Sequence, residues 1–580
     1  VSIFYVLGVE RRGVRTSHLA VAGVVFSLCY VLNAYVSDDA FISFRVADNL
    51  VRGYGLRWNP LERVQVFTSP LHTLLFSGVY WFSHDPSPLP NPTRAYLTAQ
   101  VLSYAISLTG VLWLFAGLRC RHLAWPLFLL LLSSQAFVTF TSSGLETPLV
   151  YLLLIVFYTR YLRAETSSLR DLFWLFLCAS LSVVSRIDTA LLLFPACLQL
   201  AVAGARAHRV RLLGPVLLAS LPMLAWFGFA LVYFGSLLPN TYFAKIGLDV
   251  EGSILWRMGA AYLGINAIQD PLTLSTLVLG LAVSLRRWRT ALAGAGALSY
   301  VLYIVSIGGD FLGFRYLAPP FLIAVLLIDD ALARWRPAST RRVAAFASAG
   351  LLLYGLVLPG STLRAARDLP RAHDVRFYFE ASNPTRWRPG ARFPFAPFHT
   401  VADPERCRAL RADSFRVSIT GGGLAGFCRG PLHHLVMRAG ITDPLIARLP
   451  LRVTAPFLPG HLPKPVPAGY VETRRSGENR IPDPSLAAYF DAIDSVVSGP
   501  VFAWERWRHI ARLHLTPQRR YRDPYPAAPD EPTVLHHGRR PSLVDRFHEV
   551  RSALGSPGGA VPVPGAGSAP SREAHRPPVE

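Results

Sequence analysis

The sequence has a low content of charged residues. Asp, Glu, Lys and Arg make up 16% of its 580 residues, whereas 52% are hydrophobic and the mean hydropathy is +0.33. Because an ordinary soluble domain has about 25% charged residues, this composition excludes that class and indicates an integral membrane protein.

Patterns that bind metals or nucleotides are also lacking. His433 and His434 are adjacent, so on a helix they would point apart, and the glycine run 421–423 does not follow a nucleotide-binding strand pattern. No repeat of fixed period is visible, which argues against a transporter built from matching halves. We therefore expect no cofactor. The one metal candidate is a divalent cation held by Asp38, Asp39 and ligands from outside the pair.

Basic residues outnumber acidic residues by 58 to 36, which gives a formal net charge of +22. The arginines lie in short loops between long apolar runs, where membrane insertion and contact with anionic lipid headgroups account for them. We therefore expect membrane lipids, and no nucleic acid, among the partners of the chain.

Apolar length and flanking charge predict a polytopic α-helical membrane protein with about eleven transmembrane helices. The predicted spans are 17–35, 97–117, 124–141, 147–163, 171–184, 189–204, 212–234, 272–285, 290–307, 316–333 and 343–360. The apolar segment 71–82 has only about three helical turns, so we expect it to be re-entrant or to lie in the interface. If it spanned the membrane, every later loop would change sides.

The loops between these spans alternate in charge. Arginine clusters occur at 119–122, 160–163, 206–211, 286–289 and 334–342. The alternate loops carry Asp38 and Asp39, the motif 144–147, the motif 239–242 with Lys245, and the motif 308–310 with Arg315. Positive loops stay in the cytoplasm, so the second set is placed outside. With an uncleaved first helix, the N-terminus is then cytoplasmic and the C-terminal part extracytoplasmic.

The amino-acid composition and the placement of apolar runs divide the chain into three parts. Residues 1–360 form the predicted transmembrane domain, 361–515 a small C-terminal extracytoplasmic α/β domain, and 516–580 a mostly disordered, basic, Pro-rich tail. In the second part we expect a strand at 415–420 and a helix at 435–441. Cys407 and Cys428 lie in this outer part, where a disulfide is allowed, but the sequence does not show whether the two are close.

Asp38 and Asp39 directly follow the first helix, at its outer end. A partly dehydrated carboxylate there has a raised proton affinity, so it can take a proton from a sugar hydroxyl or stabilise positive charge on a sugar ring. The alternative is that the two acids only cap the following helix.

Five other charged residues have two interpretations each. Lys245 and Arg315 suit a leaving phosphate, or they extend towards lipid headgroups. Arg186 and Asp188 separate two short apolar segments, so they form either a structural pair or part of a site. Glu146 carries the same ambiguity as Arg186 and Asp188.

Several motifs together resemble a known family. They are Asp-Asp-Ala-Phe-Ile-Ser-Phe-Arg at 38–45, Gly-Leu-Glu-Thr at 144–147, Pro-Asn-Thr-Tyr at 239–242 with Lys245, and Gly-Gly-Asp-Phe at 308–311 with Arg315. Their order and predicted side resemble the terminal arabinofuranosyltransferase family of the GT-C glycosyltransferase superfamily. The segments 440–444, 459–461 and 467–470 resemble the outer domain of that family.

The resemblance implies a GT-C-like fold and an inner-membrane glycosyltransferase. It implies transfer of a sugar, first of all arabinofuranose, from a polyprenyl-phosphate donor to an extracytoplasmic cell-envelope glycan. Asp39 or Asp38 is then catalytic, and Lys245 and Arg315 bind the donor phosphate. The sugar-binding or supporting residues are Asp310, Glu146, Asn240, Tyr242, Arg45, Arg186, Asp188 and His461. We expect Tyr470 of the outer domain to offer a stacking surface to the acceptor.

The alternative function is a non-catalytic membrane scaffold or assembly factor with the same fold. A related flagellar-motor-control group shares the membrane motifs and is not clearly enzymatic. The fold alone therefore does not decide between sugar transfer and scaffolding.

Overall fold

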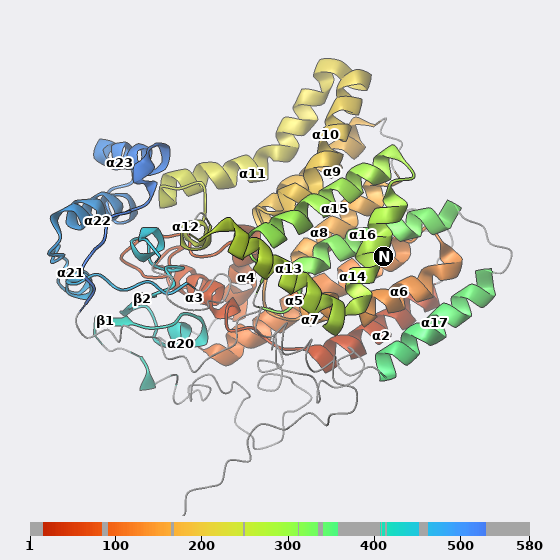
Figure 1. Ribbon diagram of the computed structural model, residues 1–580, viewed down its shortest axis with the longest axis horizontal. Coiled ribbons are helices and arrows are strands. Elements are labelled where there is room, and N and C mark those ends of the chain that lie inside the picture. Colours follow the sequence, from red (N-terminus) through yellow and green to blue (C-terminus); the bar gives the residue numbers. More distant parts are fainter. Residues whose placement is uncertain are drawn as a thin grey trace, which may run out of the picture.

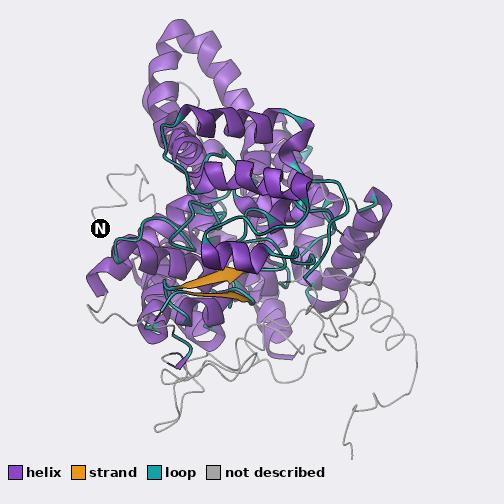
Figure 2. Cartoon of the chain, turned by 90° about the vertical axis from the view of Figure 1, so that its left-hand side faces the viewer, coloured by secondary structure: helices purple, strands orange, loops and turns teal. Residues whose placement is uncertain are grey.

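The structure of the chain is a computed structural model that describes residues 16–83, 91–163, 168–246, 250–310, 312–334, 340–357, 407, 409–411, 414–451 and 462–528. It is mostly helical, with two short strands at one end of the molecule (Figures 1 and 2).

The first half of the chain and the segment up to residue 357 build a bundle of helices. Its longer helices are α2 (Thr16–Asn33), α5 (Pro92–Gly117), α6 (Ala124–Ser133), α8 (Thr147–Tyr161), α9 (Leu169–Ser185), α10 (Thr189–His208), α11 (Leu213–Phe234), α13 (Gly252–Gln269), α14 (Pro271–Ser284), α15 (Trp288–Ser306), α16 (Ala318–Arg334) and α17 (Thr340–Val357). Shorter helices are α3 (Ala40–Val51), α4 (Pro70–Ser83), α7 (Gln135–Thr139) and α12 (Asn240–Lys245).

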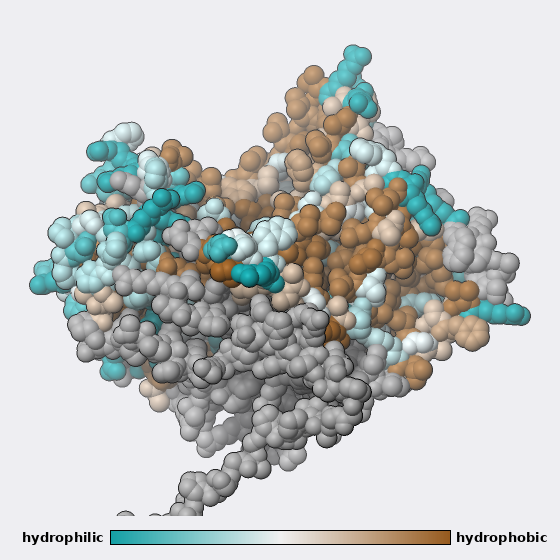
Figure 3. Space-filling view, viewed as in Figure 1, coloured by the Kyte–Doolittle hydropathy of each residue, from teal (hydrophilic) through white to brown (hydrophobic). Residues whose placement is uncertain are grey.

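Several helices are apolar and long enough to cross a membrane. Among the described residues these are four stretches, Thr16–Asn33, Pro92–Gly117, Thr189–Phe234 and Arg315–Arg334. A fifth results if α13 and α14, which are bent by 110° at their junction, form one broken span. The outer surface of the bundle is apolar over a wide area (Figure 3). The chain is therefore a multi-pass membrane protein, whereas the number of about eleven spans stays a prediction.

Helix α13 has no counterpart among the predicted spans. Its apolar residues are interrupted by Arg257 and end in Asn266 and Gln269, so no long apolar run marks it in the sequence. The structure nevertheless buries its Tyr262 and Ile265 in the main hydrophobic core. Helix α4, by contrast, lies where the short apolar segment was predicted, and its 14 residues are fewer than the roughly 20 needed to span.

The described residues of the C-terminal part form a small sheet and four α-helices. Strand β1 (Arg416–Ile419) pairs in parallel with β2 (His433–Val436). The helices are α20 (Gly423–Cys428), α21 (Tyr470–Ser476), α22 (Pro484–Val497) and α23 (Trp504–Leu515). The strand predicted at 415–420 is therefore confirmed. A disulfide joins Cys407 to Cys428, which fits an oxidising compartment.

Two predictions for this part were wrong. Residues 435–441 do not form a helix, because Leu435 and Val436 are buried as part of β2. Tyr470 does not offer a stacking surface, because its side chain is fully buried and its hydroxyl donates a hydrogen bond of 2.8 Å to the Asp443 carboxylate.

The C-terminal part also extends beyond the predicted boundary at residue 515. The backbone N–H of Tyr521 donates to the Arg448 carbonyl at 3.1 Å, and that of Ala528 donates to the Val466 carbonyl at 2.9 Å. Residues 516–528 thus pack on this part rather than belonging to the tail.

Arg45 of α3 holds the membrane part and the C-terminal part together. Its buried guanidinium donates hydrogen bonds to the carbonyls of Trp58 (3.0 Å), Gly426 (2.5 Å) and His433 (2.8 Å). The guanidinium carbon also lies 4.6 Å from the centre of a Trp58 ring. A planar group with five donors suits this task, since one side chain reaches three carbonyls from different segments. Arg45 is therefore placed to support the fold.

Replacing Arg45 with methionine should loosen this junction. The change removes the Arg45 donor from three buried carbonyls, of which that of Trp58 still accepts from the Asn49 amide, and we expect it to cost about 3 kcal/mol of stability. Thermal unfolding and limited proteolysis of the purified chain measure the effect. The matched control is Arg480→Met, because the Arg480 side chain is 59% exposed. Equal behaviour of the two variants would contradict the role given to Arg45.

Candidate functional site

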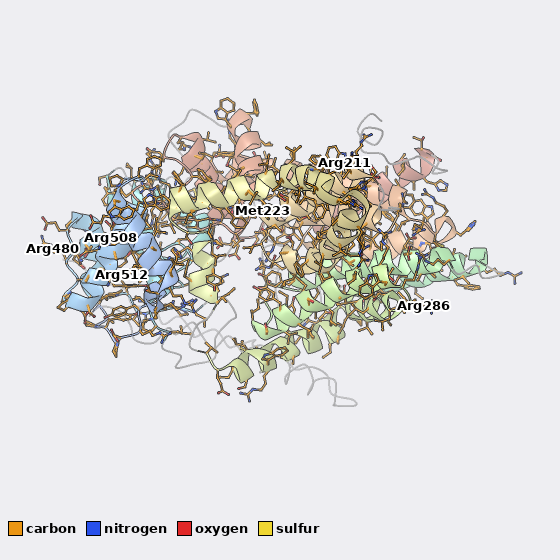
Figure 4. The ribbon with its side chains drawn as sticks, turned by 90° about the horizontal axis from the view of Figure 1, so that it is seen from above. Arg211, Met223, Arg286, Arg480, Arg508 and Arg512 are labelled. Atoms are coloured by element: carbon orange, nitrogen blue, oxygen red, sulfur yellow. A yellow bond between two sulfur atoms is a disulfide. The ribbon has the colours of Figure 1, made fainter. Side chains whose placement is uncertain are left out.

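The charged residues of the alternate loops meet at one end of the helix bundle. They come from the turn before α3, the residue before α8, the α9–α10 turn, the end of α12 and the α15–α16 connection. In sequence order they are Asp38, Asp39, Glu146, Arg186, Asp188, Lys245, Asp310 and Arg315. Segments more than 270 residues apart in the sequence, from residue 38 to residue 315, thus contribute to one cluster. Arg211 and Arg286, from two loops predicted to be cytoplasmic, lie away from the part of the molecule that carries Arg480, Arg508 and Arg512 (Figure 4).

Arg186 is the centre of the first part of the cluster. Its guanidinium pairs with the Glu146 carboxylate at 2.6 Å and with the Asp188 carboxylate at 2.5 and 2.9 Å. All three side chains are at least 80% shielded from solvent. Asp188 is also the residue that precedes α10, so the turn between two helices fixes the geometry. The structure therefore places Glu146, Arg186 and Asp188 in one ion-paired group.

Arg315 forms the second part. Its Nε atom lies 2.6 Å from a carboxylate oxygen of Asp310, and its Nη2 atom donates to the Tyr316 hydroxyl at 3.1 Å. The guanidinium carbons of Arg186 and Arg315 lie 4.9 and 4.7 Å from the centre of the Tyr316 ring. Tyr316 therefore joins the two cations of the cluster. The sequence analysis missed this residue, because a single Tyr before an apolar run carries no signal of its own.

Lys245 and Asp39 differ from these paired groups. Within the described part of the chain, neither the Lys245 ammonium nor the Asp39 carboxylate has a hydrogen bond or an ion pair, and both side chains are half-buried. Burial lowers the pKa of Lys245 below its usual value, although the nearby charge of Asp39 acts in the opposite direction. Lys245 and Asp39 are thus close enough to interact electrostatically, yet each is open to a ligand.

The capping alternative for the two aspartates is wrong for Asp39. Asp39 occupies the N-cap position of α3, but its side chain makes no capping hydrogen bond. Asp38 instead binds the C-terminal part, since its carboxylate accepts the Leu424 N–H at 2.9 Å. Gly423 makes room for that carboxylate: its φ is +67°, and a Cβ there would lie 2.0 Å from an Asp38 oxygen. The two neighbours therefore have different surroundings.

Burial raises the pKa of the Asp38 carboxyl to about 7, and the Leu424 hydrogen bond only partly offsets this effect. Among the residues that the structure describes, no three His, Cys, Asp or Glu side chains gather as a metal site would require.

Three further residues were predicted to bind the sugar or support the site, and the structure describes two of them. Asn240 is buried, and its amide donates to the carbonyls of Gly440 (2.8 Å), Ile441 (3.1 Å) and Asp443 (3.1 Å), so it ties α12 to the C-terminal part. Tyr242, on the same helix, is half-buried beside Phe243. His461 lies outside the described residues.

The chain is similar in sequence to one curated enzyme. No family model matches it. The terminal beta-(1->2)-arabinofuranosyltransferase of Mycobacterium tuberculosis is 30% identical over 355 residues, which are 51% of this chain and 53% of that protein. The chain thus spans about half the length of the curated relative it matches.

Solved structures of two proteins are weakly similar to this chain. ArnT from Cupriavidus metallidurans in the apo state gives a TM-score of 0.41 at 17% identity, over 62% of this chain and 66% of that one. ArnT bound to undecaprenyl phosphate gives 0.39 at 16% identity, over 62% and 67%. The arabinosyltransferase EmbB from Mycobacterium smegmatis gives 0.35 at 14% identity, over 57% and 32%.

The raised pKa of Asp38 makes stability depend on pH. The folded-state pKa of about 7 exceeds the unfolded value of 3.8, so the folded chain binds more protons between these values. Stability should therefore fall as pH rises through this window and level off above it. Asp38→Asn keeps an oxygen that accepts the Leu424 N–H but cannot ionise. We expect its unfolding temperature to exceed that of the wild type at about pH 8, and we expect the difference to be clearly smaller at about pH 5, where only part of the window has been passed. A constant difference at both pH values would contradict this account.

Proposed function

We propose that this chain belongs to the terminal arabinofuranosyltransferase family and that it transfers a sugar from a polyprenyl-phosphate donor to a cell-envelope glycan. The first candidate for the sugar is arabinofuranose, because the curated relative is named for it. The proposal also includes a GT-C-like fold, an inner-membrane location and an extracytoplasmic site.

One observation carries the proposal. In a cluster where Arg186 and Arg315 are neutralised by acids, Lys245 and Asp39 are the cation and the acid that have no partner among the residues the structure describes. Unpaired charges that are half-buried are costly for stability, so a functional ligand is the simplest reason to keep them. The arrangement offers one positive group and one basic group to the same bound molecule.

The cations suit the phosphate of the donor. Lys245 carries an ammonium free to approach a phosphate oxygen, and Arg315 lies close enough to share the charge. When the bond between the sugar and the phosphate breaks, the electron pair stays on the phosphate oxygen, so negative charge grows there. A preorganised cation in a water-poor site stabilises this charge. Arg186 and Tyr316 hold Arg315 in position from the other side.

Asp39 suits the acceptor hydroxyl. In the proposed step the hydroxyl oxygen bonds to the anomeric carbon, its proton passes to the Asp39 carboxylate, and the polyprenyl phosphate leaves with the bonding electrons. Asp310, Glu146 and Asp188 are less available as bases, because each already accepts an ion pair from an arginine. A direct displacement of this kind inverts the sugar carbon.

The scaffold alternative makes a different prediction for the same residues. A scaffold needs the buried contacts of Arg45 and Asn240, but it has no use for an unpaired Asp39. The cluster geometry therefore favours sugar transfer.

The test is a transfer assay with the purified chain. Synthetic polyprenyl-phosphate arabinofuranose and an arabinan acceptor are supplied to the wild type, to Asp39→Asn and to Asp38→Asn. Loss of a general base lowers the rate by roughly 10²–10⁴-fold, and we expect this for Asp39→Asn with unchanged folding. Asp38→Asn is the matched control and should keep most of the activity at neutral pH. Full activity of Asp39→Asn, or no product from a folded wild type with several sugar donors, would favour the scaffold.

Lys245 can be tested through the donor. Lys245→Met removes the cation, keeps the length of the side chain and should lower kcat/KM for the donor by roughly 10²–10³-fold. Lys245→Arg restores a cation and should recover part of the loss. Steady-state rates at several donor concentrations give kcat and KM separately. If Lys245→Met changed neither kcat nor KM, the phosphate role of Lys245 would be wrong.

A further inference from the structure

Helix α23 is fastened to the last turn of α11. The buried Arg506 donates to the Tyr233 carbonyl at 3.2 Å and to the Val496 carbonyl at 2.8 Å. A ring nitrogen of His514 lies 2.9 Å from the Gly235 carbonyl oxygen. Gly235 directly follows α11, and the stretch Thr189–Phe234 is one of those that can cross a membrane. Helix α23 therefore lies where α11 leaves the bilayer.

Helix α23 carries large apolar side chains on two opposite faces. Arg506, Ile510 and Leu513 are buried against α22 and the end of α11. The other face presents Trp504, Arg508, Ala511 and Leu515, which follow one another at spacings of four, three and four residues and so form one stripe. Phe502 precedes the helix on the exposed surface.

The exposure of this second face is unusual. Phe502 is 84% exposed, Trp504 78% and Leu515 83%. Large apolar side chains left so open in one patch mark a surface that binds a partner or a membrane. The charges of this surface indicate the chemistry of the partner, because Arg508 in the stripe and Arg519 after the helix are exposed, and Glu505 is the only acid in the helix. Arg508 and Arg512 lie on the same helix at the end of the molecule opposite Arg286 (Figure 4).

We propose that the surface formed by Phe502, Trp504, Arg508 and Leu515 lies in the headgroup region of the membrane leaflet next to the site. The aromatic and aliphatic side chains enter the boundary between headgroups and acyl chains, and Arg508 and Arg519 bind the phosphates of anionic lipids. Aromatic residues with flanking cations are the typical composition of such interfacial helices.

Continuity with the membrane-spanning surface favours lipid over a protein partner. Leu217, Leu221 and Leu224 of α11 are each more than half exposed, which is the surface that lipid covers on a span. Because α23 is bonded to the end of that same helix, lipid that coats α11 also reaches the α23 surface. The C-terminal part is then anchored to the membrane at a second place, independently of whether the chain transfers a sugar.

A spin label measures where this surface lies. Leu515→Cys is introduced into the full chain after the free cysteines Cys29, Cys120, Cys178 and Cys197 are replaced by alanine, with the disulfide retained. The labelled chain is placed in nanodiscs of phosphatidylcholine, with and without phosphatidylglycerol. Relaxation by oxygen, which concentrates in the bilayer, is compared with relaxation by a water-soluble nickel chelate. Arg480→Cys, exposed on the C-terminal part at a distance from α23, is the control.

We expect the Leu515→Cys label to show a severalfold higher ratio of oxygen to nickel accessibility than the Arg480→Cys label. The combined change Arg508→Glu and Arg519→Glu should lower this ratio in nanodiscs with phosphatidylglycerol more than in those without it. Equal ratios at the two positions would overturn the proposal. A label shielded from both reagents would also overturn it, in favour of a protein or a second copy on this surface. Lipid contact without any effect of phosphatidylglycerol would overturn the assignment to anionic headgroups.

Discussion

The structure depends on how charge is neutralised where water is scarce. Arg186 is shared by Glu146 and Asp188, and Arg315 is paired with Asp310. A buried ion without a partner is far more costly than a paired one, so these contacts fix the turns between helices that would otherwise be free to move. Asp39 and Lys245 remain as the carboxylate and the ammonium of the cluster that have no partner in the described part of the chain.

The same logic explains how the C-terminal part is held over the cluster. The side chains of Arg45 and Asn240 donate hydrogen bonds to backbone carbonyls of the C-terminal part. The Asp38 carboxylate accepts a hydrogen bond from a backbone N–H of the same part. Three polar residues from the membrane part thus hold the C-terminal part in place: Asp38 lies next to Asp39, Asn240 is on the same short helix as Lys245, and Arg45 is on the helix that follows Asp39. Two adjacent aspartates consequently serve different purposes: Asp38 for assembly and Asp39, in our proposal, for chemistry.

The sequence predicted the long helices and the charged loops well, because apolar length and arginine placement are local properties of the chain. It failed for α13, whose Arg257 and Asn266 interrupt the apolar pattern while tertiary packing still buries Tyr262. It also failed for 435–441, where pairing with β1 decides the conformation. The supporting roles of Arg45 and Asn240 depend on carbonyls about 200 to 390 residues away, and a single sequence does not reveal such partners. For the same reason, the sequence did not decide whether Cys407 and Cys428 form a disulfide.

The central claim is that the cluster and the C-terminal part share one side of the membrane, with the arginine loops on the other. Labelling with a membrane-impermeant maleimide tests it directly in intact spheroplasts. Single cysteines replace Glu478, whose side chain is 70% exposed on the C-terminal part, and Trp288, which is 72% exposed at the start of α15. The account predicts modification of Glu478→Cys from outside, and of Trp288→Cys only after the membrane is permeabilised. The reverse pattern, or labelling of both from outside, would contradict it.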